Sequence, residues 1–160
     1  MKTRTIPTWV VVADSAKALF FTLESDNGTR SLKRAAEPMA SHIERHSGDL
    51  KSDKPGRKFG SAGGGVRHGV EPHHDYHKLE KHDFARAIVQ FLEKSFDAHT
   101  FERFVLVAPE RSLGEMRKLL PRKMGPALWH EVPHDFTKLD AAEIWLRIAP
   151  QLKEHVRPAE

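Results

Sequence analysis

The sequence contains no cysteine. Disulfide scaffolds and zinc sites built from thiolates are therefore excluded, and a reducing compartment such as the cytosol is the natural expectation. No stretch approaches the roughly 18 apolar residues of a membrane span. The apolar run from Trp9 to Ala13 is stopped by Asp14 and Lys17, and it is shorter than the roughly 7–15 apolar residues of a secretory signal. We expect a soluble, cytoplasmic protein with no cofactor and no membrane partner.

The composition is that of a globular chain with a well-solvated surface, because 39% of its 160 residues are hydrophobic and 30% are charged. No internal repeat or linker is visible, so a single domain over residues 1–160 is the simplest organisation. The formal net charge is +4, before 11 histidines are counted. A mildly basic balance favours anionic partners without identifying them. The excess is concentrated between Lys51 and Arg67, where Asp53 is the only acid.

The same region holds the most distinctive segment of the chain, KPGRKFGSAGGGVRHGV, from Lys54 to Val70. Glycines leave backbone N–H groups accessible and the cations add fixed charge, so the segment suits phosphate groups. It lacks the Lys-Ser/Thr of a P-loop, and no strand precedes it as a dinucleotide fingerprint requires. A phosphate-binding finger and a solvated surface loop both remain open. The candidate RNA- or phosphate-binding residues are Lys54, Arg57, Lys58, Gly63, Gly64, Gly65, Arg67 and His68.

The first part of the chain predicts an antiparallel meander. Thr8–Ala13 is apolar and β-branched, residues 18–23 form a second apolar run, and residues 29–36 follow the turn residues Asn27 and Gly28. Residues 38–76 contain no convincing long element and predict a loop. A helix is then expected over residues 77–96, with Asp75 as its N-cap and one apolar stripe. That stripe comprises Ala85, Ile88, Val89, Leu92 and Phe96.

The second part alternates strands and helices. Residues 104–108 predict a buried strand, and Ser112 with Glu115 predicts the capped start of a short helix that ends at Pro121. A strand over Leu128–Val132 and a last helix opened by Asp140 follow, and Pro150 should kink or end that helix. The order is antiparallel β-β-β followed by α-β-α-β-α. The sequence therefore predicts an α/β fold with a mixed, ribonuclease H-like sheet and a long glycine-rich loop before its first helix.

Two further sets of residues are weaker candidates for metal sites. His42 and His46, like His73 and His77, are four residues apart, but a solvated histidine-rich hinge explains His73 and His77 better than a metal site does. A nuclease of this fold would use carboxylates at strand ends and on the first helix to bind two metal ions. Asp14 is better explained as a turn residue, and acids at a helix start favour the dipole. The carboxylates in question are Asp14, Glu80 or Asp83, and Glu110.

Four sets of residues carry a resemblance to a known family. They are WVVVADSAKALFF, then KPGRKFGSAGGGVRHGVEPHHD running into KLEKHDFARAIVQFLEKS, then FERFVLVAPERSLGEMRKLL, and finally EVPHDFTKLDAAEI. Their sequence and order resemble the bacterial host attachment protein family. That family is itself similar to the middle domain of archaeal and eukaryotic class I peptide-release factors.

The resemblance implies a ribonuclease H-like sheet with a long insert before the first helix. In release factors this insert carries a Gly-Gly-Gln tip that helps water attack peptidyl-tRNA. Gly63 and Gly64 match that tip, but Gly65 stands where the glutamine would be, so catalysis is not expected. The first hypothesis is a non-catalytic protein that binds the ribosome or structured RNA through the loop. The alternatives are a protein associated with host attachment, at the surface or indirectly, and a metal-dependent nuclease.

Overall fold

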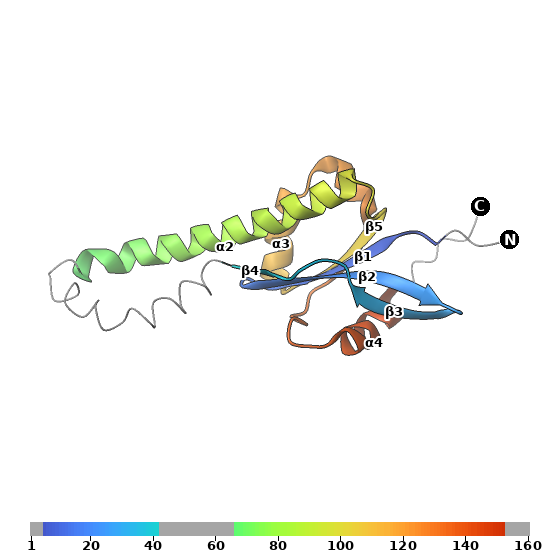
Figure 1. Cartoon of the computed structure of the whole chain (residues 1–160). Coiled ribbons are helices and arrows are strands. Elements are labelled where there is room, and N and C mark those ends of the chain that lie inside the picture. The colour runs from blue at the N-terminus through green and yellow to red at the C-terminus, as the bar shows by residue number, and fades with distance from the viewer. Residues whose placement is uncertain (1–4, 42–65, 153–160) are drawn as a thin grey trace.

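The protein is described by a computed structural model that covers the backbone of residues 5–41 and 66–152 and the side chains of residues 5–41 and 81–152. Its elements form a mixed α/β fold around a six-stranded sheet (Figure 1). The strands are β1 (Thr8–Ala13), β2 (Lys17–Asp26), β3 (Thr29–Arg34), β4 (Met39–Ala40), β5 (Arg103–Val107) and β6 (Leu128–Val132). The helices are α2 (Val66–Asp97), α3 (Glu110–Leu119), the 3₁₀ helix η1 (Arg122–Ala127) and α4 (Ala141–Leu152).

The sheet is antiparallel on one side of β1 and parallel on the other. Its order is β3-β2-β1-β5-β6, with the short β4 also paired to β2. β2 runs antiparallel to β1, β3 and β4, whereas β5 is parallel to both β1 and β6. The hairpin between β2 and β3 turns at Asn27 and Gly28, which have φ angles of 50° and 82°. The predicted meander, its turn and the two later strands are confirmed.

Helices cover both faces of the sheet, which explains why every residue of β1 is buried. Alternate side chains of a strand point to opposite faces. Trp9 and Val11 face one core, shared with α2, α3 and η1, while Val10 and Val12 face a second core, shared with α4. Figure 1 shows α2 and α4 on opposite sides of the sheet.

The first described helix begins much earlier than expected. α2 starts at Val66 rather than at residue 77, so Asp75 lies inside the helix and is not its N-cap. The predicted loop over residues 38–76 is shortened at both ends, because β4 occupies Met39–Ala40. Gly69 and Pro72 have poor intrinsic helix propensity, but propensity is a weak predictor that the rest of the structure can override.

The two later helices differ from expectation at one end each. α3 begins at Glu110 with Pro109 as its N-cap and no side-chain cap, so the capping box predicted from Ser112 is wrong. At α4 the prediction holds, because the backbone N–H of Glu143 donates to Asp140 Oδ1 over 2.8 Å. α4 continues past Pro150 to Leu152, so Pro150 does not end it.

Only part of α2 is attached to the sheet. With a rise of about 1.5 Å per residue, its 32 residues span about 48 Å. Among the side chains of α2 that are described, those of residues 81–97, the first buried one is that of Phe84, about 27 Å along the helix from Val66. Figure 1 shows the N-terminal half of α2 projecting beyond the sheet. We call residues 66–83 the projecting half of α2.

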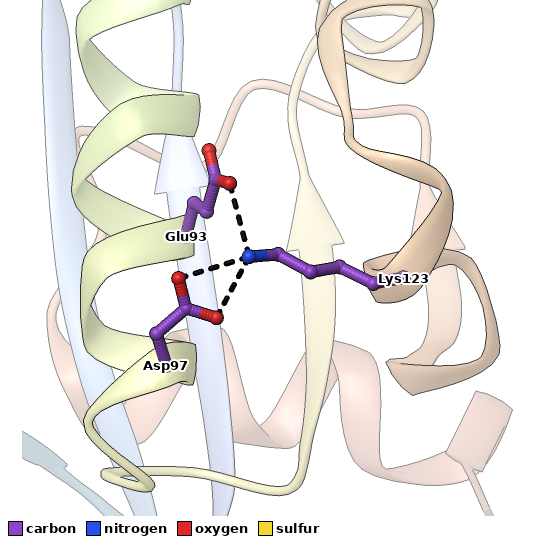
Figure 2. A network of polar contacts seen from close by, with 3 residues as sticks. All are labelled: Glu93, Asp97 and Lys123. Atoms are coloured by element: carbon purple, nitrogen blue, oxygen red, sulfur yellow. Dashed lines mark hydrogen bonds and ion pairs between the residues drawn. The ribbon is translucent and has the colours of Figure 1, made fainter.

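The C-terminal half of α2 is fixed at its base by aromatic and ionic contacts. The ring of Phe91 lies 5.9 Å from that of Trp9 and 4.8 Å from that of Phe20. Lys123 Nζ, on η1, donates to both carboxylate oxygens of Asp97 over 2.8 and 2.9 Å and lies 3.1 Å from Glu93 Oε1 (Figure 2). These contacts hold α2 at one end and leave its other end away from the sheet.

Candidate functional site

A cleft of about 780 Å³ lies at the carboxyl ends of the parallel strands β1 and β5. In open α/β sheets this edge is where ligands bind, because the loops that follow the strands converge there. Residues from α2 and α3 form its walls, and loops after β1, β5 and β6 contribute the rest. The lining residues are Asp14, Ser15, Lys81, His82, Phe84, Ala85, Ile88, Pro109, Arg111, Ser112, Glu115, Met116 and Asp135.

Asp14 enters this cleft from the turn after β1. Its Oδ1 accepts hydrogen bonds from the backbone N–H groups of Ala16, over 2.8 Å, and Lys17, over 2.7 Å. Its own N–H donates to the carbonyl oxygen of Lys17 over 2.9 Å. One carboxylate oxygen therefore closes the turn between β1 and β2, as a turn aspartate is expected to do.

The other oxygen of Asp14 joins the loop after β6. The hydroxyl Oγ1 of the buried residue Thr137 lies 3.2 Å from Asp14 Oδ2 and 2.7 Å from Asp135 Oδ1. A hydroxyl has one proton to donate, so it serves the two carboxylates alternately or unequally. The backbone N–H of Thr137 also donates to Asp135 Oδ1 over 3.1 Å. Thr137 thus connects two acidic residues that come from opposite ends of the sequence.

Charges of both signs line the cleft. Lys81 and Arg111 bring cations from α2 and α3, and Glu115 adds an acid from the second turn of α3. His82 Nε2 accepts a hydrogen bond from Arg86 over 3.1 Å, which leaves its Nδ1 as the protonated ring nitrogen. The mixture favours a ligand that carries both polar and charged groups over a simple anion.

The carboxylates proposed for a nuclease do not gather here. The side chain of Glu80 lies outside the described residues; of the other three carboxylates, Asp14 lines the cleft and Asp83 and Glu110 do not. Across the described side chains, no group of three or more His, Asp or Glu residues is arranged to hold a metal ion. The turn interpretation of Asp14 is confirmed by its hydrogen bonds.

Most of the predicted phosphate-binding residues lie outside the described part of the chain: Lys54, Arg57, Lys58, Gly63, Gly64 and Gly65. Arg67 and His68 fall in the first turn of α2 instead of a loop, and His73 and His77 lie further along its projecting half. His42 and His46 are also outside the described residues.

The sequence also failed to single out Thr137 and Asp135 as neighbours of Asp14. Thr137 and Asp14 are 123 positions apart, and only the sheet brings them together. One signal was available in the sequence. Asp14 and Asp135 each follow a predicted strand, and parallel strands end at the same edge of a sheet.

Comparison with protein families identifies one match. Residues 9–148 match the family described as "protein required for attachment to host cells". The match runs from β1 through α4 and covers most of the chain, so the protein belongs to this family. The search of curated proteins returned no match. Among the described helices, none has the length and apolar character needed to cross a membrane.

Proposed function

We propose that the protein, as a member of this family, takes part in the attachment of a bacterium to host cells. The observation that carries this proposal is the family match over residues 9–148, which includes nearly all of the sheet, the cleft and α4 as far as Ile148. The role is indirect and is exerted from the cytoplasm. The absence of cysteine suits a reducing compartment better than an exposed adhesin.

Two experiments together test this proposal. A strain that lacks the protein should attach to host cells less than the parent strain, and expression of the intact chain should restore attachment. Fractionation of the complemented strain should place the protein with cytoplasmic markers. Normal attachment by the deletion strain would refute the role, and a pool at the cell surface would show that the protein acts there directly.

A molecular activity that would account for an indirect role is binding to the ribosome or to structured RNA. The projection of α2 beyond the sheet favours this activity. A helix fixed at its base by Trp9, Phe20 and Lys123 holds its first turn, which contains Arg67 and His68, away from the sheet (Figure 1). Cations held at such a distance can contact phosphates without interference from the acids of the cleft.

In this proposal the protein binds RNA but does not release peptides. The resemblance to release factors places Gly65 where they have a glutamine, and glycine has no side chain with which to position water. The sheet order β3-β2-β1-β5-β6, antiparallel on one side of β1, agrees with the ribonuclease H-like fold of the whole domain that this resemblance implies.

Sedimentation with ribosomes at two salt concentrations tests RNA binding. Binding should weaken steeply with salt, and each lost phosphate contact should reduce the log–log slope by about 0.7–0.9. The triple variant Arg57→Glu, Lys58→Glu, Arg67→Glu should abolish co-sedimentation. A control variant with the same net charge reverses the charge of three exposed residues elsewhere in the protein, Arg34, Lys118 and Lys138. This control should still bind. Equal losses in both variants would mean that only net charge matters and would refute a specific site.

A metal-dependent nuclease is the remaining candidate. The donor set gives it little support, because Asp14 is engaged by two backbone N–H groups and by Thr137. Incubation of RNA, DNA and a hybrid with the protein and Mg²⁺ or Mn²⁺ tests it directly. Cleavage that disappears in Asp14→Asn would revive the nuclease.

A further inference from the structure

A second basic site lies at the other end of the parallel strands from the cleft. It is formed by Arg103 at the start of β5, Trp129 on β6, Thr8 at the start of β1, and Arg30 on β3. Trp129 packs against the core on the α4 face of the sheet. This cluster is separate from the basic segment of residues 54–68 and from the cleft residues.

The guanidinium of Arg103 is held in one position by two contacts. Its Nε donates to the hydroxyl oxygen of Thr8 over 2.8 Å, and that hydroxyl donates to the carbonyl of Ile6 over 2.9 Å. Its Cζ lies 3.6 Å from the ring centre of Trp129, so the planar group stacks on the indole. Because Nε is occupied, the two terminal nitrogens are the donors that remain to bind a ligand.

A β-bulge brings Trp129 into this position. Phe104 pairs with Leu128 and Val105 pairs with His130, so Trp129 is the extra residue between the two pairs. Bulges re-aim a side chain at sites where the regular alternation would point it elsewhere. The stacking of Arg103 on Trp129 therefore depends on this irregular pairing of β5 with β6.

Among the described residues, neither Arg103 nor Arg30 forms an ion pair, although other surface cations such as Lys33 and Arg117 do. Burial lowers the pKa of Arg103, and the nearby charge of Arg30 lowers it further. Both effects disfavour the charged guanidinium, and the negative charge of an anion bound to Arg103 would offset them.

We propose that Arg103 and Arg30 form a binding site for a phosphate group, with Trp129 and Thr8 holding the guanidinium of Arg103 in place. Arginine suits this role because its fixed fork of N–H donors matches the oxygens of phosphate and can form paired hydrogen bonds. The phosphate group is either free, as inorganic phosphate or a mononucleotide, or part of an RNA backbone. This site does not depend on the basic segment of residues 54–68.

Tryptophan fluorescence offers a direct test, because Trp129 touches the proposed anion-binding group. Inorganic phosphate is titrated into the full-length protein at constant ionic strength, with chloride as the exchanged anion. We expect a saturable change in fluorescence with a dissociation constant on the order of millimolar, and no such change in Trp129→Phe. Isothermal calorimetry on Trp129→Phe should detect phosphate binding that is weaker than in the parent protein, because phenylalanine attracts a guanidinium less strongly than tryptophan does. Binding as tight as that of the parent protein would show that Trp129 does not hold Arg103 in place.

Variants of the two arginines test the assignment of the site. Arg103→Gln should remove saturable binding, and Arg103→Lys should weaken it about tenfold or more, because lysine cannot form the paired contact. Arg30→Gln changes an exposed residue and should weaken binding without disturbing the fold. Arg147→Gln is the matched control, since Arg147 also lies over an aromatic ring, that of Phe136, at 5.6 Å. It should bind as well as the parent protein.

The same titration with adenosine monophosphate and with a short single-stranded RNA identifies the source of the phosphate. Competition by RNA that is lost in Arg103→Gln would assign the site to RNA, and competition by the mononucleotide alone would assign it to a small ligand. The triple variant of the basic segment should still bind inorganic phosphate, so failure of ribosome binding leaves this proposal standing. Absence of saturable phosphate binding in the parent protein, or undiminished binding in Arg103→Gln, overturns it.

Discussion

The turn that begins the cleft makes a quantitative prediction about Asp14. In Asp14→Ala the backbone N–H groups of Ala16 and Lys17 lose the acceptor that lies 2.7–2.8 Å away, and Thr137 loses one of its two acceptors. Hydrogen bonds to charged groups are worth about 1.5–3 kcal/mol each, but water can replace part of them at this half-buried position. We expect a total loss of about 2–3 kcal/mol in the free energy of unfolding.

Asp14→Asn is the matched control. The asparagine side chain keeps an oxygen for the two backbone N–H groups, and its amide can donate to Thr137 Oγ1, so the loss should stay below about 1 kcal/mol. Urea unfolding followed by circular dichroism measures both values. For a chain of this size the alanine variant should also melt about 4–12 °C lower. If both variants lose the same stability, or if alanine costs nothing, the hydrogen bonds of Asp14 do not hold this turn.

Three further predictions concern the helices. Asp140→Ala removes the acceptor that caps α4 and should cost about 1 kcal/mol in urea unfolding, with Asp140→Asn close to the parent protein, and a loss in both would contradict the cap. Hydrogen bonds from Lys123 to Asp97 and Glu93 raise the pKa of Lys123 above its ordinary value of 10.5. These contacts therefore contribute their full stability below pH 10.5, and that stability is lost as the pH rises through the raised pKa. Lys123→Met should weaken that alkaline decline, and an unchanged pH profile would show that the contacts in Figure 2 contribute nothing. Amide hydrogen exchange should be slow from Phe84 to the end of α2 and progressively faster toward Val66, whereas uniform protection would mean that another part of the chain covers the projecting half.

The strands could be predicted from the sequence because their signals are local. Alternating or continuous apolar residues mark β1 and β5, and Asn27 with Gly28 supplies the positive φ angles of the hairpin. Asp140 likewise indicated the start of α4, since an N-cap bonds within its own turn. These elements need no knowledge of the rest of the chain.

Three features could not be predicted, for two different physical reasons. The sequence predicted too late a start for α2, because Gly69 and Pro72 have poor intrinsic helix propensity. Propensity describes single residues and does not account for a helix that is extended from a packed C-terminal half. The contact of Thr137 with Asp14 depends on the order of strands in the sheet, and the stacking of Arg103 on Trp129 depends on a bulge. Neither strand order nor a bulge leaves a local pattern in the sequence.

The described residues place some cations beside the acids of the cleft and others far from them. In the cleft, Asp14, Asp135 and Glu115 offset Lys81 and Arg111, so a purely anionic ligand gains little there. Beyond the cleft, Arg67 lies in the first turn of α2, and Arg103 lies at the opposite ends of the parallel strands, both away from those acids. Long-range attraction between exposed charges fades within about 8 Å at physiological salt, whereas about 21 Å of helix separates Arg67 from Lys81, the first residue of α2 that lines the cleft. A cation in the first turn of α2 is therefore too far along the helix to be offset by the acids of the cleft.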